Sequence, residues 1–133
     1  MSRIITSLLL GAALGATPVA AARRDNPDAQ LSRLLAGRTA GRPVNCINLA
    51  QTTSSTIIEG RGIVYRVGGR LYLNVPRSGA DVLDDDDILV TRTFGSRLCR
   101  SDSVNLVSRA GRIPRGFVLL GDFVPYEKVK GRR

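Results

Sequence analysis

The sequence contains no histidine and no tryptophan, and aromatic residues make up only 5% of its 133 positions. Histidine is the commonest general base and the commonest metal ligand, so its absence removes the simplest routes to acid–base catalysis and to a metal site. We therefore expect no metal and no cofactor. With so few aromatic side chains, the core must consist mainly of valine, leucine and isoleucine.

Lysine is nearly absent, and both lysines, Lys128 and Lys130, lie near the end of the chain. No P-loop, no G-x-G-x-x-G run and no G-x-S-x-G elbow occurs. Asp102 and Asp122 each follow a strand-like segment and are the remaining candidates for a catalytic acid or base, although each would equally serve a turn or an arginine. We expect a non-enzymatic protein, with a small periplasmic enzyme using one of these carboxylates as the alternative.

Only one stretch is long and apolar, and it lies at the N-terminus. Arg3 precedes the apolar run Ile4–Ala16, and the small residues Ala20–Ala22 provide a cleavage site. The pattern predicts a Sec-type signal peptide over residues 1–22, a periplasmic or secreted bacterial protein, and no transmembrane segment after cleavage. The uncharged run up to Ala22 is also long enough for an uncleaved membrane anchor, but Pro18 and the alanines favour cleavage.

Cysteine occurs only twice, at Cys46 and Cys99. In an oxidising compartment we expect these two to form a disulfide that closes a loop of 54 residues. In the chain-entropy model such a loop contributes about 4 kcal/mol to stability. A redox pair is the alternative, but catalytic dithiols usually occur as C-x-x-C.

Positive charge exceeds negative charge by nine, and 18 of the 20 basic residues are arginine. Arginine binds phosphate and carboxylate in bidentate fashion, although a high-GC genome also enriches it. Arg61, Arg66 and Arg70 surround the central hairpin described below and are candidate anion-binding residues. We expect an anionic envelope component or an acidic protein as the partner, and no nucleic acid, because the protein is exported and has few aromatics to stack on bases. The oligomeric state stays open.

Two strand-like runs flank Gly68-Gly69 and predict a hairpin over residues 61–75 in which Tyr65 lies opposite Tyr72. Large apolar residues occupy both of its faces, which predicts burial on both sides. Before it, Asn26 and Pro27 begin a short amphipathic helix that ends near Gly37.

Short strands with turns at near-regular spacing continue to Pro125. The pattern is typical of a mainly β fold: a small antiparallel barrel or sandwich of about seven strands after one short N-terminal amphipathic helix. We expect four segments: the signal peptide, a helix and connector (23–43), a β domain (44–126) and a basic C-terminal tail (127–133).

Four consecutive aspartates, Asp84 to Asp87, interrupt the strands. A calcium loop spaces its oxygen ligands and includes a sharp glycine turn, and neither feature is present. We expect a solvated turn whose charge discourages edge pairing of the next strand.

Two short motifs, Cys46-Ile47 and Cys99-Arg100-Ser101-Asp102, carry a resemblance. Over about Val44–Leu106 the chain resembles an uncharacterised family of small secreted proteins of proteobacteria, which have a signal peptide, an early Cys-Ile and a later Cys-x-x-Asp. The further cysteine that other members tend to have between these motifs is absent here. The resemblance implies export and an all-β domain, and it brings no known activity.

Overall fold

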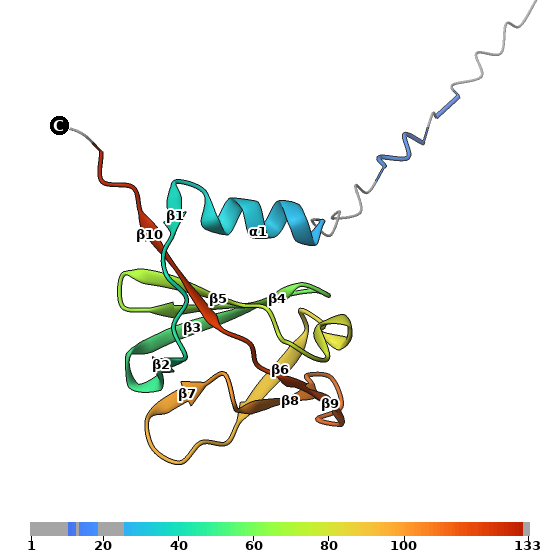
Figure 1. Ribbon diagram of the computed structural model, residues 1–133. Coiled ribbons are helices and arrows are strands. Elements are labelled where there is room, and N and C mark those ends of the chain that lie inside the picture. The colour runs from blue at the N-terminus through green and yellow to red at the C-terminus, as the bar shows by residue number, and fades with distance from the viewer. Residues whose placement is uncertain (1–10, 13, 19–25, 132–133) are drawn as a thin grey trace, which may run out of the picture.

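The computed structural model describes residues 11–12, 14–18 and 26–131. Figure 1 shows a helix, α1, on one side of a β-sheet and further strands on the other side of that sheet. The elements are α1 (Pro27–Leu35), β1 (Arg38–Ala40), β2 (Cys46–Asn48), η1 (Leu49–Gln51), β3 (Thr52–Ile58), β4 (Gly62–Val67), β5 (Arg70–Asn74), η2 (Ala80–Val82), β6 (Asp87–Thr91), β7 (Arg97–Cys99), β8 (Ser103–Ser108), β9 (Pro114–Leu119) and β10 (Phe123–Lys128).

Three antiparallel sheets make up the β domain. Five strands form the large sheet in the order β1-β10-β5-β4-β3, three form the small sheet in the order β6-β8-β9, and β2 and β7 form a ribbon. The arrangement is sandwich-like and not a closed barrel. The predicted mainly β antiparallel fold after one short helix is confirmed, with ten strands in the described residues where about seven were expected.

The central hairpin, β4 and β5, has the register that the sequence predicts. Three cross-strand pairs confirm it: Val67 with Arg70, Tyr65 with Tyr72, and Ile63 with Asn74. Gly68 has a φ of 59°, whereas Gly69 is not in the positive-φ region. A positive φ at the first central residue alone is typical of a type II′ turn, which matches the right-handed twist of the two strands.

Two hydrophobic cores lie on opposite faces of the large sheet. Between the sheets, Tyr65 and Phe123 pack edge to face with ring centroids 5.8 Å apart, among aliphatic side chains of both sheets. On the other face, Val64, Leu71 and Leu73 pack against the leucines of α1. The hairpin supplies residues to both cores, so the predicted burial of both its faces is confirmed.

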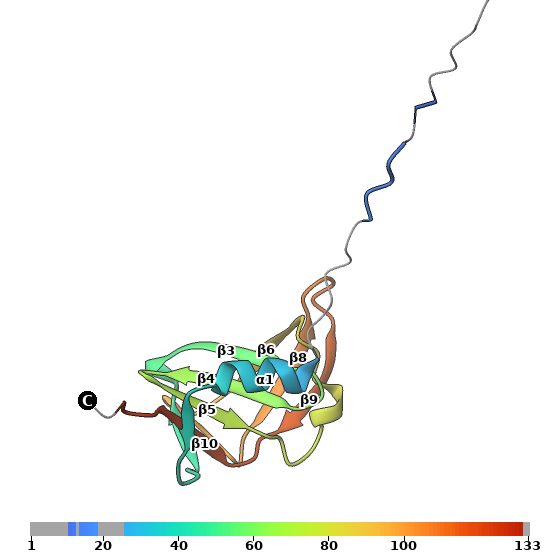
Figure 2. The same ribbon diagram turned by 90° about the horizontal axis from the view of Figure 1, so that it is seen from above.

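Helix α1 begins and ends where its sequence predicts. The N–H of Asp28 donates to the side-chain oxygen of Asn26 at 2.9 Å, and Pro27 occupies the first helical position. Gly37 follows the helix with a φ of 70°. The leucines at 31, 34 and 35 face the large sheet, and Figure 2 shows the helix lying over β4 and β5.

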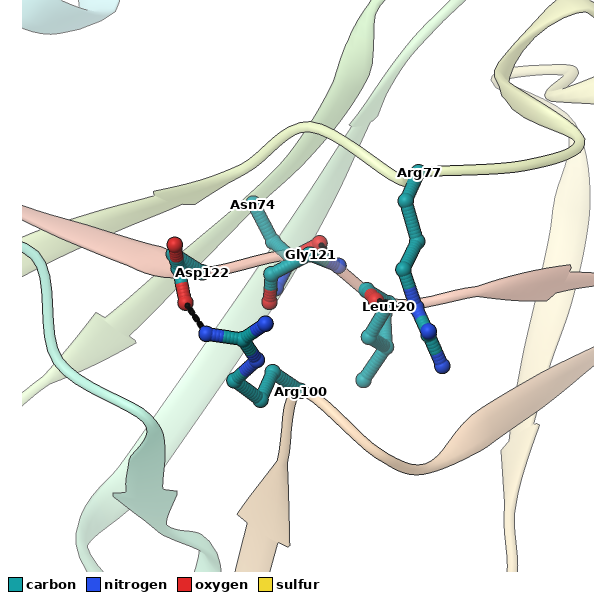
Figure 3. Close-up of polar contacts among 6 residues, drawn as sticks. All are labelled: Asn74, Arg77, Arg100, Leu120, Gly121 and Asp122. Atoms are coloured by element: carbon teal, nitrogen blue, oxygen red, sulfur yellow. Dashed lines mark hydrogen bonds and ion pairs between the residues drawn. The ribbon is translucent and has the colours of Figure 1, made fainter.

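The chain crosses from the small sheet to the large sheet at residues 120–123, which we call the crossing segment. Asn74, fully buried at the end of β5, binds the backbone of this segment through both ends of its amide (Figure 3). Its Nδ2 donates to the carbonyl of Gly121 at 2.7 Å, and its Oδ1 accepts from the Gly121 N–H at 2.9 Å. A Cβ at position 121 would collide with the carbonyl of Val75, so glycine is required there.

Other backbone groups of the crossing segment also have partners. The N–H of Leu120 donates to the carbonyl of Asp102 at 3.1 Å, and its carbonyl accepts from Arg77 Nε at 2.9 Å. Phe123 exchanges two backbone hydrogen bonds with Val44. Leu120 and Phe123 can therefore be completely buried without unpaired peptide groups. The apolar run from Gly116 through Val124 is thereby divided between β9 and β10, which belong to different sheets.

The sheet also extends beyond the boundaries expected at residues 44 and 126. β1 lies in the expected connector and pairs with the last three residues of β10. Pro125 does not end that strand, because its carbonyl points away from β5 and accepts from the Gly41 N–H at 2.7 Å. The position of the missing N–H therefore also faces away from β5, and no hydrogen bond of that pairing is lost.

Cys46 on β2 and Cys99 on β7 lie directly opposite each other and form a disulfide, as predicted. The closed loop contains η1, β3, the central hairpin and β6, which contribute to both cores.

The predicted signal peptide, residues 1–22, lies largely outside the described residues. Within the described ranges no helix combines the length and the apolar character needed to cross a membrane.

Replacing both cysteines, Cys46→Ala with Cys99→Ala, is expected to lower the free energy of unfolding by about 4 kcal/mol, because the unfolded chain regains the entropy of an open loop. Urea titration of this variant and of the oxidised protein measures the difference. Reduction of the disulfide with dithiothreitol should likewise lower the melting temperature. A melting temperature unchanged by reduction contradicts a stabilising bridge.

Tyr65 should make the protein sensitive to alkali. Its hydroxyl is buried without a hydrogen-bond partner among the described residues, and burial raises the pKa of Tyr65 above its ordinary value of 10.0. Ionisation of Tyr65 therefore favours the unfolded chain. The stability that the neutral side chain provides is intact below pH 10. At higher pH the free energy of unfolding falls by about 1.4 kcal/mol per pH unit until the pKa of Tyr65 in the folded protein is reached. Tyr65→Phe should lack this loss in urea titrations at about pH 8 and about pH 11. An identical alkaline loss in Tyr65→Phe rules Tyr65 out as the cause.

Candidate functional site

Arg61 and Arg70, two of the three candidate anion-binding residues, already hold carboxylates. Arg61 binds Asp28 in bidentate fashion, with Nε–Oδ1 at 2.7 Å and Nη2–Oδ2 at 3.0 Å. This pair joins α1 to the start of β4, and the hydrogen bond from Arg61 lowers the pKa of the Asp28 carboxyl. Arg70 Nε lies 2.8 Å from an oxygen of Glu127. Both guanidinium charges are thus balanced locally.

Arg66, the third candidate, is exposed and has no carboxylate partner within the described residues. It lies near the far end of β4 from Arg61, roughly 17 Å along the strand at 3.3 Å per residue. The three predicted residues are therefore not brought together as one anion site.

Other exposed arginines also lack a carboxylate partner in the part of the chain that the structure describes. With Arg66 they form the set Arg42, Arg66, Arg77, Arg92, Arg97 and Arg112, of which Arg77 donates instead to the carbonyl of Leu120. Two members of this set, Arg92 and Arg97, bracket a single loop. An unpaired guanidinium group on the surface can bind an external anion without first breaking an internal ion pair.

The β6–β7 loop, residues 92–96, carries a fully exposed phenylalanine, Phe94, between these two arginines. The loop is tied to the domain, because the carbonyl of Ser96 accepts from the Leu49 N–H at 2.7 Å. Within it, the Thr93 hydroxyl donates to the carbonyl of Gly95 at 3.1 Å. The loop lies on the opposite side of the molecule from α1 (Figure 1). The segment from Arg92 to Arg97 thus carries one exposed apolar ring and two exposed cations within six residues.

Asp102 and Asp122, the candidate catalytic carboxylates, both have internal partners. Asp102 Oδ2 accepts from the Cys99 N–H at 2.7 Å, and the Asp102 N–H donates back to the Cys99 carbonyl. Asp122 pairs with Arg100, Nη1–Oδ1 3.0 Å, where both side chains are about half exposed (Figure 3). Their roles in this structure are to fix a turn and to hold an arginine beside the crossing segment.

The four aspartates do not all lie in a solvated turn. Asp85 and Asp86 are exposed, as expected, but Asp87 begins β6 and is only 6% exposed. The expectation of a solvated turn is therefore wrong for Asp87. Its Oδ1 lies 3.2 Å from Arg115 Nε, whereas Oδ2 is buried and has no hydrogen-bond partner among the described residues. Within the described ranges no group of three or more His, Cys, Asp or Glu side chains is placed to hold a metal ion.

Asp87 lines a groove of about 530 Å³ between the edge strands of the two sheets. β3 forms one wall and β6 the other, and α1 contributes Gln30. The lining combines carboxylates, a guanidinium, hydroxyl-bearing residues and aliphatic side chains: Gln30, Ser55, Thr56, Ile57, Asp85, Asp87, Ile88, Leu89 and Arg109. A volume of this size is typical of a small-molecule site.

Neither the loop nor the groove was identified as a site from the sequence. The signal for the loop is short: an aromatic residue flanked by arginines and a glycine-serine turn. No sequence signal marks the groove, because it depends on which strands become sheet edges. The burial of Asp87 depends in turn on Arg115, which is 28 residues away in sequence.

Asp102 and Asp122 should differ in their effect on stability. Asp102→Ala removes the acceptor of a part-buried backbone N–H, so we expect a loss of about 1–2 kcal/mol in the free energy of unfolding. Asp122→Ala breaks an exposed ion pair and should change the free energy of unfolding by less than about 0.5 kcal/mol. Urea titration of both variants makes the comparison, and equal losses contradict the distinction.

Comparison of the chain with protein-family models, with curated proteins and with solved structures finds no significant match in any of the three.

Proposed function

We propose that this protein is an exported, non-enzymatic β-domain that binds an anionic component of the cell envelope through the β6–β7 loop. The observation that carries the proposal is the fully exposed Phe94 between two arginines that have no carboxylate partner in the described part of the chain. An aromatic ring inserts into the interfacial region of a membrane, while guanidinium groups beside it meet lipid phosphates. The acidic-protein partner considered from the sequence is the competing outcome of the test below.

The distribution of charge supports this location. Five arginines are neutralised by carboxylates of the protein: Arg61, Arg70, Arg100, Arg109 and Arg115. Among the described residues Arg92 and Arg97 have no carboxylate partner, and the β6–β7 loop that they flank lies on the side of the molecule away from α1 (Figure 1). The net charge of +9 adds a long-range attraction to any anionic surface.

Export is part of the same proposal. Its support is the signal-like N-terminal sequence together with the disulfide, which persists in oxidising compartments such as the periplasm. Phosphate-bearing lipids and glycans are the abundant anions there.

Protein lacking residues 1–22 should sediment with phosphatidylglycerol vesicles at low ionic strength, remain free of phosphatidylcholine vesicles, and dissociate as salt is raised. Arg92→Gln with Arg97→Gln should weaken binding by about tenfold or more, since each arginine near an anionic surface contributes about 1 kcal/mol. Phe94→Ser should weaken it by about fivefold through the lost apolar contact.

Matched variants separate the loop from net charge. Arg61→Gln with Arg70→Gln removes the same charge from arginines that are already paired, and Val129→Ser removes another exposed apolar side chain, just after β10. Both should bind nearly as well as the unchanged protein. Equal losses in the two arginine pairs, or equal binding to both kinds of vesicle, contradict the assignment to the loop. A protein that binds neither vesicle overturns the lipid partner and leaves the acidic protein.

A further inference from the structure

We propose that the outer face of the small sheet, the face that points away from the large sheet, holds one acyl chain of a phosphate-bearing lipid whose phosphate binds Arg92. The inference deepens the proposed function and rests on it for the class of ligand, since Arg92 belongs to both sites. It adds a groove for a single lipid chain, which the β6–β7 loop by itself does not provide.

Side-chain alternation gives the small sheet this outer face. The residues of β8 and β9 that are completely buried between the two sheets are Val104, Leu106 and Val118. Their neighbours along the same strands point the other way, and Phe117 there is 55% exposed. Val90 on β6 lies opposite Asn105, which lies opposite Phe117. These three residues therefore form one row across the outer face.

A groove of about 370 Å³ lies on this face, and we call it the outer groove. Its lining consists of Val90, Arg92, Asn105, Val107, Pro114, Gly116 and Phe117. Most of these residues are apolar, and none is a carboxylate. Laying an aliphatic chain over such a surface removes apolar area from water, which is favourable. The volume is within the range of pockets that bind small ligands.

Arg92 gives the outer groove one charged end. It is the only charged residue of the lining, and it has no carboxylate partner within the described residues. Val107 lies opposite Ile88, so the apolar end of the groove is four residues along β6 from Arg92, roughly 13 Å at 3.3 Å per residue. A guanidinium group binds phosphate in bidentate fashion. The outer groove thus matches an anionic head group followed by an acyl chain.

Other occupants fit this lining less well. A second copy of the chain would bring a like charge, because the net charge is +9. A peptide carries backbone N–H and C=O groups that need hydrogen-bond partners when they are buried. Besides Arg92, the lining offers only one polar side chain, that of Asn105. An acyl chain needs no such partners.

Octyl phosphate, used below its micelle concentration, is the probe. Octyl glucoside carries the same chain on an uncharged head group, and inorganic phosphate carries the charge without the chain. Amide NMR spectra of the oxidised protein should show saturable shifts at residues 90, 92, 105, 107 and 117 with octyl phosphate, with a Kd of about 1 mM or tighter. Each control should bind about tenfold more weakly or worse. A control that binds as tightly as octyl phosphate, or shifts scattered over the whole surface, overturns the inference.

Arg92→Gln should weaken octyl phosphate binding about tenfold, because it removes the charged donor to the phosphate. Arg112→Gln removes the same charge from another exposed arginine that has no carboxylate partner among the described residues and does not line the outer groove. It should leave the Kd within about twofold. Equal effects of the two substitutions overturn the assignment to Arg92.

Phe117→Ser should weaken the binding of both octyl compounds about fivefold, because the chain loses apolar contact. Ile113→Ser removes an apolar side chain that is 61% exposed and does not line the outer groove, and it should leave both affinities within about twofold. Equal effects of these two substitutions contradict a chain bound in the groove.

Asn105→Asp places a carboxylate in the outer groove with almost no change of shape at an exposed position. It should abolish octyl phosphate binding, because like charges repel, and leave octyl glucoside binding unchanged. Retained octyl glucoside binding also shows that this variant is folded. Unchanged octyl phosphate binding overturns the inference.

The vesicle assay separates a failure of this inference from a failure of the proposed function. Sedimentation with phosphatidylglycerol vesicles without octyl phosphate binding overturns the outer groove and leaves the β6–β7 loop as the membrane contact. Octyl phosphate binding without sedimentation overturns the loop as the membrane contact and supports a site for a single lipid molecule. Hexaglutamate that displaces octyl phosphate at equal concentration overturns the inference, because charge alone would then account for binding.

Discussion

The hydrogen bonds around the crossing segment connect the parts of this fold. Asn74 at the end of β5 binds Gly121 on both sides of its peptide unit, and Arg77 and Asp102 hold Leu120 from two further directions. Because the polar backbone groups there have partners, Leu120 and Phe123 can be buried between the sheets. The orientation of the small sheet on the large sheet therefore depends on the short segment that joins the two sheets.

The large sheet is buried on both faces, and this explains why so small a domain has two cores. α1 covers the face that carries Val64 and Leu71, and the small sheet covers the face that carries Tyr65. The disulfide closes a loop that contains the hairpin at the centre of this arrangement. Covalent closure and apolar burial thus stabilise the same unit, with little need for aromatic side chains.

Charge is distributed unevenly over this frame. Six acidic residues pair with arginines, and these pairs connect α1, the ends of strands and the corner at Asp84 to Asp87 to the rest of the domain. Among the described residues, Arg92 and Arg97 lack such partners and flank the exposed Phe94, and the buried Oδ2 of Asp87 has no donor. The surface therefore carries a cationic, partly apolar loop on the side of the molecule away from α1, and the groove between β3 and β6 lies elsewhere.

Local sequence determined the helix, most of the strands and the register of the central hairpin, because capping residues, turn glycines and alternating apolar positions act over a few residues. It also determined the disulfide, because only two cysteines were available to pair. Tertiary structure alone decided the rest. Gly121 divides one apolar run between two sheets, Pro125 remains inside a strand, and Asp87 is buried beside a groove. Each of these outcomes depends on a partner distant in sequence: Asn74, Gly41 and Arg115. The sequence likewise did not indicate which arginines stay without a carboxylate partner, since an arginine is neutralised only by the carboxylate that folding places beside it.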